Sequence, residues 1–123
     1  MWSDERGFTL LELLGAIAII GVLAAIAIPG LLSQRTKAYH AAMAEDLHAL
    51  ATSELAFNTE NGTFTTDLAL LASEGYRASD GVDARVSVAG HSFVACTKHP
   101  GVREWLVYDS ATSQLSDAAL PCA

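Results

Sequence analysis

The chain begins with a long apolar stretch and then changes to an alternation of apolar and polar residues. From Phe8 to Ile28 the only charged residue is Glu12, among Leu, Ile, Ala, Val and Gly. A helix rises about 1.5 Å per residue, so this stretch is about 30 Å long as a helix and can cross the hydrocarbon core of a bilayer. Gly15, Gly21 and several alanines give it small faces, which let apolar helices pack closely but are also common in any membrane helix. The pattern predicts a membrane-spanning helix.

Beyond residue 30 the pattern is that of an amphipathic helix. The Pro29-Gly30 pair removes a backbone donor and adds flexibility, so the helix is expected to kink or fray there. Over residues 31–58 the charged residues, Asp46 and Glu54 among them, fall mostly on faces other than the apolar one, and Asn61-Gly62 supplies a stop. The apolar residues recur at spacings of three, four or seven: Tyr39, Met43, Leu47, Leu50 and Phe57. The pattern predicts one continuous helix whose C-terminal half lies on a globular head.

The remainder predicts a connecting segment followed by a small antiparallel sheet. Within residues 59–82, Thr66-Asp67 can cap a short helix over residues 68–72 that ends at Gly75. Asn61-Gly62-Thr63 satisfies a glycosylation sequon, but a turn is the simpler interpretation. Alternating runs then fall at residues 85–88, 92–96 and 104–108, with turns at 89–91 and 99–101 and a weaker run at 114–116. The predicted fold class is α+β, with the long helix packed on the sheet.

A short cluster at the start of the apolar stretch identifies a family. Gly7-Phe8-Thr9-Leu10-Leu11-Glu12 combines a glycine, an aromatic residue and a glutamate with the apolar span that follows. A carboxylate inside such a span is costly and usually has a partner that neutralises it. The cluster resembles the processing site of type IV prepilins and the related pseudopilins. The remainder of the chain is similar to the pilin fold in the order of its elements.

The resemblance implies roles for several residues. A membrane-embedded aspartyl peptidase would cut between Gly7 and Phe8, and the same enzyme would methylate the new N-terminus at Phe8. Glu12 corresponds to the glutamate that pairs with the N-terminal amine of a neighbouring subunit during assembly. Gly21 lies where the first helix can loosen in the fibre, and Pro29 corresponds to the proline at which that helix kinks.

The same resemblance implies a division of the chain. Residues 1–7 would be the leader peptide and residues 8–30 the transmembrane and assembly half of the first helix. Residues 31–123 would be the globular pilin head, with its helix at 31–58, its connecting loop at 59–82, and its sheet and C-terminal loop at 83–123.

Two simpler interpretations of the N-terminus are open. Ala25-Ile26-Ala27 has the form of a secretory cleavage site, but residues 1–7 lack the positive charge of an ordinary signal peptide, and the apolar run is long and contains Glu12. An uncut transmembrane anchor is the other alternative. It leaves the cluster from Gly7 to Glu12 without an explanation.

The charge of the chain excludes some functions. Fourteen acidic residues stand against seven basic ones, and only two of these are lysines. A nucleic-acid-binding surface needs clustered Lys and Arg to replace counterions, so no nucleic-acid partner is indicated. The acidity is expected to keep an exposed head soluble.

The chain has two cysteines, Cys96 and Cys122. A head that faces outward from a membrane lies in an oxidising compartment, where an even number of cysteines indicates a disulfide, with two free thiols as the alternative. The resemblance favours the bond, since many pilins close a C-terminal loop in this way. No metal site is expected, because His40, His48, His91 and His99 have no ligand spacing with the cysteines.

No catalytic motif is found in the sequence. It contains no Gly-x-Ser-x-Gly, no His-Glu-x-x-His and no phosphate-binding loop. Asp80, Asp83 and Asp109 would bind a cation only if the fold brought them together. We expect a protein that is not an enzyme, holds no cofactor or metal, and is itself the substrate of a processing enzyme.

The resulting hypothesis is a structural subunit of a type IV pilus, cleaved and N-methylated by a prepilin peptidase. It would be a single-pass precursor in the cytoplasmic membrane and then polymerise into a helical surface fibre for adhesion, motility or DNA uptake. Its expected partners are further copies of the chain, the peptidase and methyltransferase, the assembly platform, minor pilins, and membrane lipid before assembly.

Two alternatives remain. A pseudopilin of a type II secretion or competence system is the alternative within the family. Major pseudopilins of secretion often carry a calcium site and lack a disulfide in the C-terminal loop, so Cys96 and Cys122 favour a pilin. Tip subunits often lack the glutamate, so Glu12 favours an ordinary subunit. A membrane-anchored binding domain that never polymerises is the alternative from another class.

Overall fold

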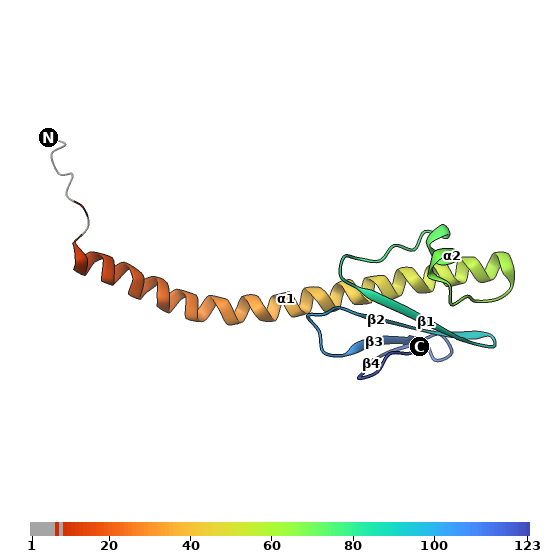
Figure 1. Cartoon of the computed structure of the whole chain (residues 1–123). Helices are drawn as coiled ribbons and strands as arrows, with labels where there is room; N and C mark the ends of the chain where they lie inside the picture. Colours follow the sequence, from red (N-terminus) through yellow and green to blue (C-terminus); the bar gives the residue numbers. More distant parts are fainter. Residues whose placement is uncertain (1–6, 8) are drawn as a thin grey trace. The chain divides into compact units, whose positions relative to one another are not determined.

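The computed structural model describes Gly7 and residues 9–123 of the chain (Figure 1). The elements in this part are α1 (Leu10–Asn61), α2 (Leu68–Ser73), β1 (Asp83–Ala89), β2 (Ser92–Lys98), β3 (Trp105–Asp109) and β4 (Gln114–Ala118). The chain separates into two compact units, one that ends at Arg35 and one from Thr36 to Ala123. The second unit, called the head below, holds the C-terminal half of α1, the short helix and all four strands.

The sheet of the head is antiparallel, with the strand order β1-β2-β3-β4. Strands that follow one another in the sequence are also neighbours in the sheet, so the topology is a meander. β1 and β2 pair from Ala89 with Ser92 to Asp83 with Lys98. Between them the chain turns at Gly90, whose φ of 61° lies in the left-handed region that glycine adopts without strain.

The structure confirms the α+β fold and the predicted order of elements. The runs predicted at 85–88, 92–96 and 104–108 correspond to β1, β2 and β3, and the weak run at 114–116 is β4. The short predicted helix is α2, which is capped by Asp67 through a hydrogen bond of 2.8 Å from the Ala69 N–H. Gly62, with a φ of 77°, follows the last residue of α1 and confirms the predicted stop.

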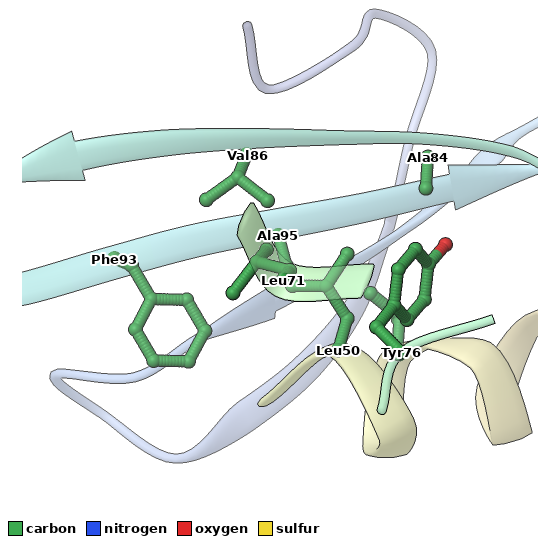
Figure 2. Packing of buried hydrophobic residues seen from close by; sticks show 8 residues of the cluster. Leu50, Leu71, Tyr76, Ala84, Val86, Phe93 and Ala95 are labelled. Carbon is green, nitrogen blue, oxygen red and sulfur yellow. The ribbon is translucent and has the colours of Figure 1, made fainter. Parts of the chain in front are cut away.

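The core of the head lies between α1, α2 and one face of the sheet (Figure 2). Alternate residues of β1 and β2 face this core, because successive side chains on a strand point to opposite sides. Phe93 contributes aromatic contacts, with ring centroids 4.9 Å from Phe64 and 6.0 Å from Tyr108. The buried cluster consists of Leu47, Leu50, Leu71, Tyr76, Ala84, Val86, Phe93 and Ala95. Burying one large apolar side chain stabilises a fold by about 1.5–3 kcal/mol, so this cluster holds the head together.

The apolar face of α1 is partly as predicted. Three of the predicted residues are buried and two are half-buried: Met43, Leu47 and Leu50, and Tyr39 and Phe57. The expectation that Asp46 and Glu54 lie on polar faces is wrong, because their exposed fractions are 2% and 0%. The segment after α1 supplies the reason, since Ser79 and Thr65 donate backbone hydrogen bonds to these two carboxylates.

The helix α1 continues through Pro29 and Gly30 without an interruption. The fraying that we expect at this pair is therefore not seen. A proline inside a helix removes one hydrogen bond, but the turns on both sides can keep their geometry. A kink at Pro29 and a loosening near Gly21 concern the helix in an assembled fibre and stay predictions.

A close contact between the β2–β3 turn and α1 explains one glycine. The rings of Tyr39 and His99 are stacked, with centroids 3.8 Å apart, and the Gly101 N–H donates to His99 Nδ1 at 3.0 Å. A β-carbon at Gly101 would lie 2.5 Å from Cε2 of the Tyr39 ring. Only a residue without a side chain fits between this turn and the ring.

We predict that Gly101→Ala destabilises the head by about 1–3 kcal/mol, because the added methyl group overlaps the Tyr39 ring. Denaturant unfolding of the detergent-solubilised chain, followed by circular dichroism, measures the change. In a Tyr39→Ala background the same substitution should have almost no effect. An equal loss in both backgrounds would show that the ring contact is not the cause.

Candidate functional site

The predicted processing site lies at the beginning of α1. Gly7 and Thr9 are exposed and α1 begins at Leu10. Phe8, the predicted methylated residue, lies outside the described residues.

Glu12 has a partner within its own helix. The Thr9 N–H donates to Glu12 Oε2 and the Glu12 N–H donates to Thr9 Oγ1, both at 3.2 Å. This reciprocal pair is a capping box, which satisfies two backbone donors that have no acceptor in the first turn of a helix. Our sequence analysis missed it, although the spacing Thr-x-x-Glu before an apolar run is its signature. The carboxylate is therefore held one turn from the predicted cleavage site.

The first half of α1 presents apolar side chains that nothing in the described part of the chain covers. Every large apolar side chain from Leu10 to Leu32 is at least half exposed, with values between 50% at Leu14 and 79% at Leu11. The helix is long and apolar enough to cross a membrane, judged by length and composition. Soluble monomers rarely expose a continuous apolar surface of this extent. This surface is suited to lipid or to other apolar helices.

Small residues interrupt this apolar surface. A β-carbon built at Gly15 or at Gly21 would meet no atom within 4 Å. Neither glycine is therefore required by a contact within the described part of the chain. Both leave space for a neighbouring helix to approach closely.

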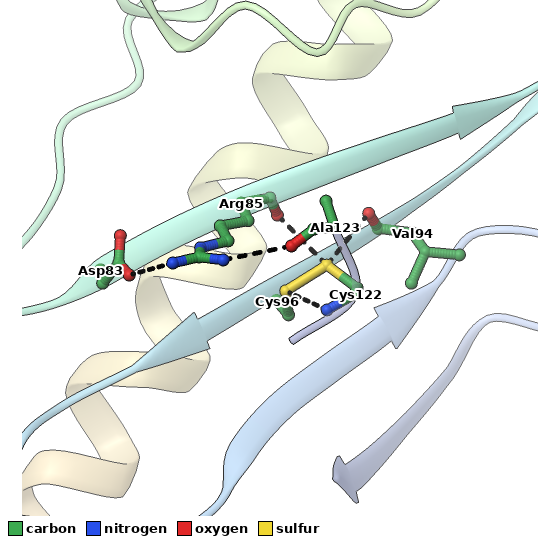
Figure 3. The surroundings of a disulfide bond; sticks show 6 residues. All are labelled: Asp83, Arg85, Val94, Cys96, Cys122 and Ala123. Atoms are coloured by element: carbon green, nitrogen blue, oxygen red, sulfur yellow. Dashed lines mark hydrogen bonds and ion pairs between the residues drawn. A yellow bond between two sulfur atoms is a disulfide. The ribbon is translucent and has the colours of Figure 1, made fainter. Parts of the chain in front are cut away.

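The C-terminal segment is attached to the outer face of the sheet, opposite the core (Figure 3). Cys122 forms a disulfide with Cys96 of β2, which confirms the predicted bond and the disulfide-closed C-terminal loop. Arg85 donates through Nη1 to the Ala123 carbonyl oxygen at 3.2 Å, and its guanidinium carbon lies 5.1 Å from the centroid of the Trp105 ring. These contacts form a clamp, defined by the disulfide, Arg85 and Trp105, that fixes the last residues of the chain.

The described residues show no arrangement typical of a metal centre. In that part of the chain no three His, Cys, Asp or Glu side chains are grouped to hold a metal ion. Asp83 lies 3.6 Å from Arg85, and Asp109 accepts a hydrogen bond from the Ala111 N–H at 2.9 Å. The convergence of Asp80, Asp83 and Asp109 that a cation site needs is therefore not seen among the described residues.

Two buried groups in the head have shifted pKa values. Burial raises the pKa of Glu54 above its usual value, and the hydrogen bond from the Thr65 N–H opposes this shift in part. Burial raises the pKa of Tyr76 to about 12, with the charges of Asp46 and Asp83 adding to the effect. The Tyr76 hydroxyl thus stays protonated at neutral pH and is no candidate base.

Comparisons with known proteins agree with this arrangement. Residues 2–28 match the family described as the prokaryotic N-terminal methylation motif. Over almost its whole length the chain is similar to the type IV wide pilus major component PilA4 of Thermus thermophilus. The identity is 30% over an alignment of 128 positions, which covers 97% of this chain and 98% of that relative.

Two further relatives match about half of the chain. The type IV major pilin protein PilA of Myxococcus xanthus is 39% identical over 61 residues, which are 50% of this chain and 28% of that protein. The type II secretion system core protein G of Klebsiella pneumoniae is 37% identical over 62 residues, which are 50% of this chain and 44% of that protein. The matched part spans less than half the length of each of these two proteins.

An uncovered apolar helix with a methylation motif at its start, together with a helix-on-sheet head, defines the class of type IV filament subunits. The chain belongs to the type IV pilin family, which includes the related pseudopilins.

We predict that removing the disulfide lowers the free energy of unfolding of the head by about 3–4 kcal/mol, as the chain-entropy relation gives for a loop of this length. The Cys96→Ala, Cys122→Ala double variant and the reduced wild-type chain should lose similar amounts in denaturant unfolding. The control is the oxidised wild-type chain, measured in the same buffer without reductant. A loss below about 1 kcal/mol would mean that the remaining clamp contacts already hold the C-terminal segment.

Proposed function

We propose that the chain is a structural subunit of a type IV pilus. It is made as a single-pass precursor in the cytoplasmic membrane and polymerises with further copies of itself into a fibre on the cell surface. The observation that carries this proposal is the combination of an uncovered apolar helix with a folded, acidic head. The similarity over the full length to a major pilus component supports it.

The precursor is the substrate of a prepilin peptidase that hydrolyses the bond between Gly7 and Phe8. The same enzyme methylates the amine of Phe8. The exposed, non-helical backbone at Gly7 and Thr9 and the match to the methylation motif support this step. No described residue of the chain is assigned a catalytic role in it.

Assembly transfers the apolar half of α1 from lipid into the centre of the fibre. Outside the membrane, packing these helices in the centre of the fibre keeps their apolar surface away from water, which supplies cohesion, and the small residues around Gly21 let the helices approach closely. Glu12 is neutralised by the N-terminal amine of a neighbouring subunit. Because an unpaired carboxylate in an apolar core is costly, this pair selects the register of assembly.

The disulfide favours a pilus over a secretion pseudopilus. The Cys96–Cys122 bond closes the C-terminal loop, in which major pseudopilins of secretion often carry a calcium site and lack a disulfide. A pseudopilin of a type II secretion or competence system is the second candidate, supported by the match to core protein G over half of this chain. The assembly platform, minor pilins and, before assembly, membrane lipid are the further partners that this proposal includes.

Mass spectrometry of material sheared from the cell surface tests the proposal first. We expect a chain that begins at methylated Phe8 and is lighter by two hydrogens for the Cys96–Cys122 bond. An intact Met1 terminus found only in membranes would indicate an anchored domain that does not polymerise. A start near Pro29 would indicate an ordinary secreted protein.

We predict that Glu12→Ala is processed normally but enters fibres poorly, because the variant lacks the charge that pairs with the incoming amine. The ratio of sheared to membrane-bound protein should fall by about tenfold or more, as expected for the loss of a desolvated ion pair. Glu45→Ala, which removes an exposed carboxylate on the same helix, is the matched control. Wild-type amounts of fibre from Glu12→Ala would refute the register role.

A further inference from the structure

Two buried carboxylates of α1, Asp46 and Glu54, hold the segment between α1 and β1 against the helix. They differ in how many of their oxygens accept hydrogen bonds. Both oxygens of Asp46 accept hydrogen bonds from Ser79, one from the N–H at 2.8 Å and one from the hydroxyl at 2.6 Å. Glu54 accepts one bond through Oε2, from the Thr65 N–H at 3.0 Å. Its Oε1 is buried and has no hydrogen-bond partner among the described residues. The segment is thus firmly held near Ser79 and incompletely held near Thr65.

The Glu54 carboxyl group lies under the part of this segment that leads into α2. Residues 62–75, called the flap below, contain Phe64, which packs edge-on against Phe93, and Leu71, which is fully buried. Figure 2 shows Leu71 above the α1 residue Leu50 in the core. These contacts dock the flap on α1 and β2 through apolar surface, and the Glu54 carboxyl group lies beneath it.

Among the described residues, no opposite charge compensates Glu54. Burial is the larger cause that acts on its pKa, and it raises the value; the Thr65 N–H lowers it in part, and no charged side chain in the described part of the chain adds to these causes. A carboxylate with one neutral donor and no cation is costly to keep ionised away from water. The neutral carboxyl is therefore the form that fits the docked flap.

A second carboxyl contact joins α1 to the end of the flap. Glu74 is the C-cap of α2, and Glu60, on the last turn of α1, is close enough for its negative charge to act on the Glu74 carboxyl. A negative charge near a carboxyl group disfavours its ionised form. Desolvation and then the negative charge and hydrogen bond of Glu60 raise the pKa of Glu74. The pKa values of Glu54 and of Glu74, at the far end of the flap, are thus both raised, so a rise in pH ionises a carboxyl group at each place.

We propose that the flap is an acid-stabilised element of the head, with Glu54 as the group whose ionisation loosens it while the Asp46–Ser79 contact keeps the segment attached. The pilus function does not require this device, so the two proposals can fail separately. Because the pKa of folded Glu54 lies above the ordinary value of 4.5, the stabilisation by its neutral form is complete below pH 4.5. It is lost as the pH rises through the pKa of the folded protein.

Amide hydrogen exchange of the full chain in detergent, measured from pH 4.5 to pH 8, tests this proposal. Rates are corrected for the intrinsic pH dependence of exchange, and peptides covering residues 63–75 are compared with peptides from β2. We expect the opening equilibrium of the flap to rise with pH, by up to about tenfold per pH unit while one group titrates. The β2 peptides should not change.

Three variants test which carboxyl group causes the pH dependence of flap opening. Glu54→Gln keeps an acceptor for the Thr65 N–H but cannot ionise, so the pH dependence at Thr65 should disappear. Glu60→Gln should reduce the dependence near Gly75 and leave that at Thr65 unchanged. Glu45→Gln, the same change at an exposed position of α1, should behave as the wild type. Flap protection in the wild type that does not change with pH would overturn the proposal, and so would a dependence at Thr65 that persists in Glu54→Gln.

Discussion

The first half of α1 presents an apolar surface that the described part of its own chain does not cover, and the rest of the structure depends on this constraint. Water solvates such a surface poorly, so the segment must lie in lipid or against other apolar helices. The second half of the same helix satisfies its apolar face within the head. One helix therefore combines a part that needs an external environment with a part that folds on its own sheet, and the polymer proposed here is a way for the first part to exchange lipid for protein.

The head is small, and covalent and polar restraints supplement its apolar core. A domain of this length buries a limited core, and short domains commonly add covalent or polar restraints to it. Here the core cluster around Leu50 and Phe93 is supplemented by the disulfide on the outer face of the sheet and by Asp46 on the helix side. Each restraint ties a segment without regular structure to a strand or helix. Such restraints lower the entropy of the segments that would otherwise open first.

Apart from the disulfide, which the cysteine count and the family resemblance indicate, the features that the sequence predicts correctly are local or repetitive. Strand alternation around Val86, the cap at Asp67 and the glycine stop after Asn61 depend on neighbouring residues, so periodicity and turn chemistry find them. The burial of Asp46 and Glu54 depends on where the segment after α1 lies, and the pattern of α1 alone carries no signal for it. The contact of Arg85 with Trp105 depends on the pairing register of three strands. The capping box at Thr9 and Glu12 differs from these, because its spacing is visible in the sequence.

The clamp at the C-terminus has an optical consequence. The chain has two tryptophans, Trp2 and Trp105. The proposed cleavage removes Trp2, so the mature subunit would keep a single indole, buried under the Arg85 guanidinium on the face that carries the disulfide. The intrinsic fluorescence of an assembled fibre would then come from one kind of site, at which each subunit reports whether its own C-terminal segment is in place.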